Sequence, residues 1–253
     1  MLIDLNSDIG ESYGAFKVGQ DEAIIPYVTS VNIACGYHAG DHAVMAKTVQ
    51  LAAANGVAIG AHPGYPDLQG FGRRFIPMKN EEIYQAVIYQ LGALQAMCKA
   101  YGTDMKHVKP HGALYNVAAV NTSVAQAIVD ATFDVNPQLI LYGLSGSELV
   151  KVGERSGLRV AHEVFADRTY QKNGTLTPRT DLNALIHNPE VAANRIIQLV
   201  KTGTILCHTG EEIQLKADTI CVHGDHVEAL LFVKKLHERL QAEGMTLKEV
   251  GAH

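Results

Sequence analysis

Short apolar runs alternate with longer amphipathic segments along the chain of 253 residues, and this alternation restricts the possible folds more than any other feature. Repeated strand–helix units of this kind predict a parallel sheet with right-handed crossovers. The strands are expected at residues 2–7, 30–34, 57–61, 107–109, 139–142, 159–164 and 219–222. The helices are expected at residues 41–54, 81–101, 123–132, 146–156, 189–202 and 225–243.

Seven or eight parallel strands in a chain of this length favour a closed (β/α) barrel of the TIM-like type. An open doubly wound sheet is the alternative, and the local pattern does not separate the two. We expect one domain over residues 1–253, because no linker, charge block or low-complexity segment interrupts the pattern. Residues 202–219 are typical of a hairpin with Gly210 at its turn.

Composition excludes several classes of protein. The net charge of −5 and the lack of a Lys/Arg run argue against a nucleic-acid partner. No apolar run approaches the roughly 20 residues that span a bilayer, and the first residues lack the pattern of a signal peptide. None of the four cysteines lies in a C-x-x-C pair, so we expect buried, reduced thiols and a cytoplasmic protein without a membrane partner.

Polar residues follow most of the predicted strands. A single histidine in such a place is more often a loop residue or a helix cap, but here glycine-flanked histidines recur after the second, third, fourth and last strands. Because the carboxyl ends of parallel strands converge on one face, we expect these residues to share one cleft. The long polar loops at residues 62–78 and 165–180 favour a site at the same face.

The residues at these strand ends suit hydrolytic chemistry. The candidate catalytic residues are Asp8, His38, His62, His111 and Asp225. The candidate substrate-binding residues are Asn6, Arg73, Lys109, Tyr115, Arg168 and His223. Among them Arg73, Lys109 and Arg168 are cations that suit a carboxylate or phosphate group, with arginine able to bind it through two hydrogen bonds.

The sequence leaves two arrangements of the site open. Asp8, His62 and His111 are candidate ligands of one divalent metal ion that leaves positions for water. Alternatively, Asp8 or a histidine is a general base in a site without metal. Lys109 lies on the same side of an extended segment as His111, where its charge would oppose a metal cation. We therefore favour the site without metal, and a bound divalent metal stays uncertain.

Seven ordered motifs together resemble the LamB/YcsF family over nearly the whole chain. They are "DLNSDIGESYG", "SVNIACGYHAGD", "GAHPGYPD…FGRR", "VKPHGALYN", "FADRTY", "LTPR" and "ADTICVHGD". The resemblance implies a barrel of the glycoside hydrolase/deacetylase type. It also implies the opening of 5-oxo-L-proline to L-glutamate at the expense of ATP, with magnesium, in a complex with 5-oxoprolinase subunits B and C.

No G-x-x-x-x-G-K-[ST] motif occurs in this chain, so any use of ATP needs another binding mode or another subunit. Two further functions remain open beside the small-molecule lactam hydrolase. One is a stand-alone, metal-dependent amidohydrolase or carbohydrate deacetylase, which the barrel type and the Asp8, His62 and His111 pattern suggest. The other is a non-catalytic subunit that binds substrate for its partners.

Overall fold

Seven parallel strands close into a barrel in the computed structural model, which describes residues 1–222 and 229–252. Around the barrel, in order, the strands are β1 (Leu2–Ile9), β2 (Ser30–Ala34), β3 (Ala58–His62), β4 (Met105–Val108), β5 (Ile140–Leu144), β6 (Arg159–Phe165) and β9 (Thr219–Cys221). Strand β9 pairs with both β6 and β1, which closes the ring. The predicted TIM-like barrel is confirmed, and the open sheet is excluded.

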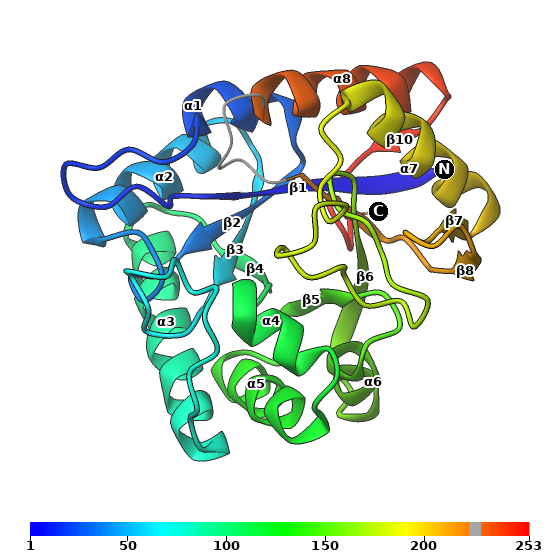
Figure 1. Cartoon of the computed structure of the whole chain (residues 1–253). Helices are drawn as coiled ribbons and strands as arrows, with labels where there is room; N and C mark the ends of the chain where they lie inside the picture. Colours follow the sequence, from blue (N-terminus) through cyan, green and yellow to red (C-terminus); the bar gives the residue numbers. More distant parts are fainter. Residues whose placement is uncertain (223–228, 253) are drawn as a thin grey trace.

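Helices surround the ring of strands (Figure 1). They are α1 (Asp21–Ile24), the 3-10 helix η1 (Ile25–Tyr27), α2 (His42–Ala54), α3 (Asn80–Ala100), α4 (Gly112–Ala118), α5 (Thr122–Val135), α6 (Glu148–Arg155), α7 (Pro189–Thr202) and α8 (Ala229–Ala242). Strands β7 (Thr204–Leu206) and β8 (Glu212–Gln214) form the expected hairpin. Strand β10 (Thr246–Leu247) adds to the outer edge of β1 near its first residues.

Helix ends differ from the predicted limits where side chains cap them. The carboxylate of Asp41 accepts hydrogen bonds from the backbone N–H groups of Ala43 and Val44, so α2 begins one residue later, at His42. Ser147 caps α6 in the same way. Helix α4 has only seven residues and was not predicted, because two turns are too short to show a helical period.

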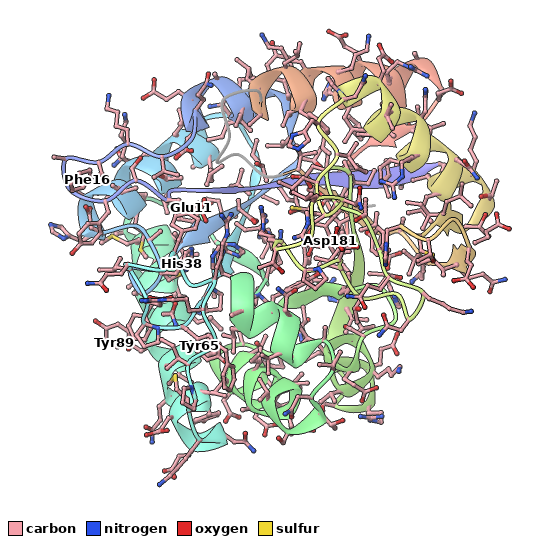
Figure 2. All side chains as sticks on the ribbon, viewed as in Figure 1. Glu11, Phe16, His38, Tyr65, Tyr89 and Asp181 are labelled. Carbon is pink, nitrogen blue, oxygen red and sulfur yellow. The ribbon has the colours of Figure 1, made fainter. Side chains whose placement is uncertain are left out.

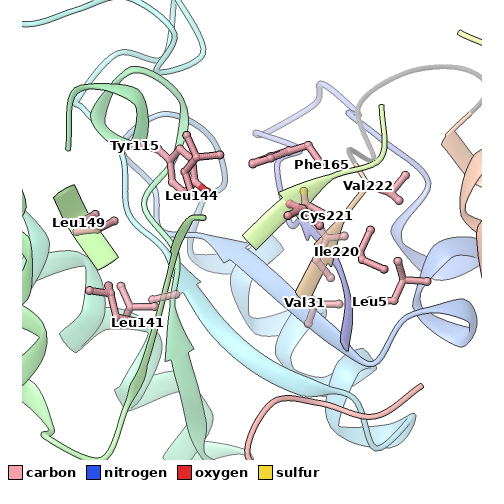
Figure 3. Packing of buried hydrophobic residues seen from close by; sticks show 14 of the residues in the cluster. Leu5, Val31, Tyr115, Leu141, Leu144, Leu149, Phe165, Ile220, Cys221 and Val222 are labelled. Carbon is pink, nitrogen blue, oxygen red and sulfur yellow. The ribbon is translucent and has the colours of Figure 1, made fainter. Parts of the chain in front are cut away.

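The interior of the barrel is polar, whereas its outer surface is apolar. Successive side chains of a strand point to opposite faces, and on β1 the buried Asp4, Asn6 and Asp8 alternate with Leu5 and Ile9. The inner residues bond to polar groups of other strands, while Leu5 and Ile9 belong to the apolar core. Figure 3 shows part of this core, with Leu5, Val31 and Ile220 on the neighbouring strands β1, β2 and β9.

A hydrogen-bonded network of polar side chains fills the interior of the barrel around Asp4 and His107. Asp4 accepts from the hydroxyl groups of Ser30 and Tyr142 at 2.7 and 3.1 Å, which compensates part of the cost of burying its carboxyl group. His107 donates from Nε2 to Oδ1 of Asn32 at 2.7 Å and stacks on Tyr142. Burial lowers the pKa of His107 to about 3, so this histidine is neutral at physiological pH.

Among the described residues, no helix combines the length and the apolarity that crossing a membrane requires. All four cysteines lie in the described part of the chain, are buried and form no disulfide.

Because His107 lies close to Gly60, we predict that a methyl group added at position 60 destabilises the fold. A Cβ atom at Gly60 would lie 2.1 Å from Nε2 of His107, so Gly60→Ala should lower the free energy of unfolding by about 3 kcal/mol through overpacking. Gly92→Ala is the matched control, because a Cβ there meets nothing within 4 Å. It should stabilise helix α3 by about 1 kcal/mol. Urea unfolding of both variants measures the difference, and equal stability of Gly60→Ala and wild type would contradict the packing.

Candidate active site

A cavity of 340 Å³ opens at the carboxyl ends of the strands, where the sequence predicted a cleft. The two long polar loops contribute to it, through Arg73 from one and through Leu176 to Thr180 from the other. Seven of the predicted site residues line it: Asp8, His62, Arg73, Lys109, His111, Tyr115 and Arg168. Residues at or just after the carboxyl ends of the four strands β1, β3, β4 and β6 therefore converge on one space.

Lys109 lies at the base of this cavity and is 2% exposed. Its Nζ atom is 2.8 Å from Oδ1 of Asp8 and 2.8 Å from Oε1 of Glu163. Burial opposes the ammonium charge, but the charges of the two carboxylates outweigh it and hold the pKa of Lys109 well above its ordinary value. One cation is therefore shared between two buried anions.

The amide of Asn32 connects the cavity to the interior of the barrel. Its Nδ2 group donates to Oδ1 of Asp8 and to Oδ1 of Asn6, both at 2.8 Å. Its own oxygen accepts from His107. Asn6 donates in turn to Glu163 at 3.1 Å. The orientations of both amides are thus fixed, and Asn6 lies beneath the cavity, where it positions Asp8 and Glu163.

The hydroxyl group of Tyr115 is hydrogen-bonded to Glu163. The hydroxyl donates to Oε2 of Glu163 at 2.6 Å, and burial together with this carboxylate raises the pKa of Tyr115 well above its ordinary value. A substrate in the cavity therefore meets the ring of Tyr115 or an oxygen that can still accept a hydrogen bond. Glu163, which is fully buried, receives hydrogen bonds from Tyr115, Asn6 and Lys109.

Three histidines and one glutamate gather at one side of the cavity. Glu11, His38, His62 and His111 are all buried, and one ligand atom from each lies within 4.8 Å of the others, so the group could hold a metal ion. Figure 2 labels Glu11 and His38, which reach this place from the ends of β1 and β2. Two of the three predicted metal ligands are in this group and Asp8 is not; its Oδ1 atom pairs with Lys109, and its Oδ2 atom lies 3.3 Å from Nε2 of His62.

Hydrogen bonds to backbone carbonyl groups orient two of these histidines. His62 donates from Nδ1 to the carbonyl oxygen of Lys109 at 2.7 Å, and His111 donates from Nε2 to that of Phe71 at 2.8 Å. Burial lowers the pKa values of His38 and His111 well below the ordinary value, so both are neutral. His38 stacks on His111 with ring centres 3.7 Å apart.

The backbone at Phe71 brings its carbonyl group to His111. Phe71 has φ of 55°, the single positive value among the described non-glycine residues. A bulky residue rarely adopts this conformation, and such strain persists where surrounding contacts hold it. The next residue, Gly72, also has positive φ, and a Cβ atom there would lie 2.7 Å from a ring atom of His111. The loop after β3 is therefore shaped to lie directly over the histidines.

Three arginines also line the cavity. Arg73, Arg168 and Arg179 line it, and the positive charges of the other two contribute to the lowered pKa of Arg168. Burial is the main cause of that shift, which brings the pKa to about 10 and leaves the group charged at neutral pH. Arg168 donates to the carbonyl oxygens of Ala184 and Thr177, so it also fixes the loop after β6.

Two predicted site residues, His223 and Asp225, lie outside the described residues. Three residues of the site were not among the candidates chosen from the sequence: Glu11, Glu163 and Arg179. Glu11 stands only three residues after Asp8 in the same polar strand end, and Arg179 belongs to the "LTPR" motif, so each carried a signal. Glu163 lies inside an apolar strand, where a buried carboxylate indicates a buried cation in the fold.

Comparison with known proteins identifies the family. The model of the LamB/YcsF family matches residues 3–253. The chain belongs to the LamB/YcsF family. It is 56% identical to the A subunit of 5-oxoprolinase from Halalkalibacterium halodurans over 248 residues, which cover 98% of this chain and 96% of the relative. It is 55% identical to the protein of the same name from Bacillus subtilis, with the same coverage.

A solved structure shares the fold of this family member over its whole length. The lactam utilization protein from Thermus thermophilus superposes with a TM-score of 0.93 at 43% identity. The match covers 98% of this chain and 99% of that one.

The shared ammonium of Lys109 predicts that its removal destabilises the barrel. Lys109→Met leaves Asp8 and Glu163 as buried carboxylates without their cation, which should lower the free energy of unfolding by about 3–5 kcal/mol. Lys106→Met, on the adjoining strand β4, is the matched control, because the side chain of Lys106 is 58% exposed. It should change stability by no more than about 0.5 kcal/mol. If denaturant unfolding shows equal losses, Lys109 does not hold the two carboxylates.

Proposed function

We propose that this chain is the lactam-opening subunit of an ATP-dependent 5-oxoprolinase, which converts 5-oxo-L-proline to L-glutamate together with subunits B and C. The observation that carries the proposal is the identity of 56% over 98% of the chain with a relative named as the A subunit of 5-oxoprolinase. The cavity supports it, because arginines line it together with Lys109, Asp8 and two histidines.

Opening the ring is a hydrolysis. The oxygen of water adds to the lactam carbonyl carbon, the bond from this carbon to the ring nitrogen breaks, and the nitrogen takes up a proton. The lactam is an unactivated amide, so we assign its activation to ATP, which binds with a magnesium ion. Because the chain has no G-x-x-x-x-G-K-[ST] motif, we assign nucleotide binding at least partly to the partner subunits.

Each side of the cavity has a part in this reaction. The arginines, with Arg73 foremost, hold the substrate carboxylate. Asp8 is the base that receives a proton from the attacking water, and its Oδ2 atom lies 3.3 Å from Nε2 of His62. The ammonium group of Lys109 lies 2.8 Å from Asp8 and, in this proposal, close to where negative charge develops on the carbonyl oxygen.

Replacing Asp8 tests its catalytic role. With subunits B and C and ATP, Asp8→Asn should reduce the rate of glutamate formation by at least about 100-fold, because the amide cannot accept the proton. Asp104→Asn is the matched control, since the side chain of Asp104 is 75% exposed at the opposite end of β4. Circular dichroism checks that both variants fold. A rate for Asp8→Asn near that of the control would contradict the assignment.

Arg73 should act on binding more than on chemistry. Arg73→Gln removes one charge-assisted hydrogen bond to the substrate carboxylate, so KM for 5-oxo-L-proline should rise about 10- to 100-fold with a smaller change in kcat. Arg155→Gln, at an exposed position of α6, should leave both constants unchanged. Steady-state kinetics at saturating ATP measures them. A lowered kcat with unchanged KM would place Arg73 elsewhere in the mechanism.

Activity assays of the chain alone, and of mixtures with subunits B and C, distinguish this proposal from the alternatives. Glutamate should form only when subunits B and C and ATP are all present. Deacetylation of a carbohydrate by the chain alone, without ATP, would instead support the stand-alone hydrolase. Full activity of a mixture that contains Asp8→Asn would support a non-catalytic binding subunit.

A further inference from the structure

We propose that Glu11, His38, His62 and His111 form a binding site for one divalent transition-metal ion, for which Zn²⁺ is the best match. The site deepens the proposed function, because the ion would lie beside the lactam cavity. Its use in ring opening rests on that function, whereas its affinity for metal does not.

The lone pairs of two histidines point toward a common place. His62 uses Nδ1 and His111 uses Nε2 to donate to backbone carbonyl groups. When both rings are neutral the remaining nitrogens carry lone pairs, and these two nitrogens, Nε2 of His62 and Nδ1 of His111, are only 2.9 Å apart. Two lone pairs repel each other at this distance unless a proton or a metal ion lies between them. Hydrogen bonding of the second nitrogen to a carbonyl is also the usual support of a metal-bound histidine.

The spacing of the other two groups also suits a metal ion. Oε1 of Glu11 lies 3.4 Å from Nε2 of His38 and 3.7 Å from Nδ1 of His111. Ligand atoms around a tetrahedral ion with bonds of about 2.1 Å are roughly 3.4 Å apart. Three of the six pairs, at 2.9, 3.4 and 3.7 Å, bracket this value, and all four atoms lie within 4.8 Å of one another. All four residues are buried, which keeps competing water away from the ligand atoms.

The charge of Lys109 does not oppose a cation in this group, which leaves Arg73, whose charge acts on His38, as the nearby cation. Lys109 was the reason to favour a site without metal, but its ammonium group lies between Asp8 and Glu163 and is compensated by them. The carboxylate of Glu11 then contributes negative charge to the group of three imidazoles. A cation in this group is therefore not repelled by an uncompensated lysine.

The kinds of ligand atom in this group determine which metal ions it would bind. Three imidazole nitrogens and one carboxylate oxygen suit Zn²⁺ and its transition-metal neighbours, whereas Mg²⁺ and Ca²⁺ prefer oxygen ligands. Such an ion can polarise a carbonyl group or lower the pKa of a bound water. Phe71 and the backbone of Lys109 hold two of the ligands, and the strained conformation of Phe71 fits a role in orienting His111.

Metal binding can be measured directly on the full chain. The protein is treated with a chelator, dialysed and titrated with Zn²⁺ by calorimetry, and the bound metal is counted by mass spectrometry after gel filtration. One equivalent should bind to the wild type. Glu11→Gln, His62→Gln and His111→Gln should each weaken binding by at least about 100-fold. His187→Gln, an exposed histidine outside the group, is the control and should bind as wild type does.

Co²⁺ offers a second readout. It should give the intense visible absorption of a tetrahedral complex in the wild type and lose it in Glu11→Gln. This variant keeps the shape of the side chain, so it serves as the test if a histidine variant fails to fold. A folded wild-type chain that takes up no Zn²⁺, or cluster variants that bind it as the control does, would overturn the proposal.

Glutamate formation with subunits B and C is assayed separately from metal binding. A chain that binds Zn²⁺ in this group yet opens no lactam with its partners would support the metal site and contradict the proposed function.

Discussion

The ammonium group of Lys109 is the interaction on which the rest of this structure depends. It lies inside the barrel between Asp8 and Glu163, at 2.8 Å from each, and is out of contact with bulk water. Both carboxylates are buried as partners of this ammonium, and burying a carboxylate ion costs several kcal/mol when no cation pairs with it. The lysine thereby makes a polar barrel interior possible and holds Asp8 at the cavity.

From Lys109 the hydrogen-bonded network continues into the barrel interior through the side-chain amides of Asn6 and Asn32, where many barrels have apolar side chains. Asn32 and Asn6 bond to Asp8 and Glu163 above and to His107 and Thr219 below. Their orientations are determined, since each donor and acceptor has a partner of the opposite kind. A TIM barrel usually fills its interior with branched apolar side chains, which can shift slightly with little cost. Here the directional bonds hold the base of the cavity in one geometry, as precise chemistry requires.

Much of the fold and of the site could be predicted from the sequence, for reasons that differ by element. The strands were predictable because buried parallel strands are short apolar runs, and the convergence of His62, Lys109 and His111 followed from the rule on strand ends. The polar interior was missed, although alternation of Asp4, Asn6 and Asp8 along β1 carried the signal. The grouping of Glu11 with the histidines depends on loop conformations, above all at Phe71 and Gly72, that no periodic pattern encodes.

We propose that the cavity beside Lys109 has arginines that bind the substrate carboxylate and, next to them, a group of histidines that holds a metal ion. A crystal structure of the chain grown with Zn²⁺ and 5-oxo-L-proline tests this most directly, with anomalous scattering recorded at the zinc edge. We expect one anomalous peak among Glu11, His38, His62 and His111, and the lactam in the cavity with its carboxylate toward Arg73. A peak elsewhere, or a lactam bound outside the cavity, would contradict the proposal.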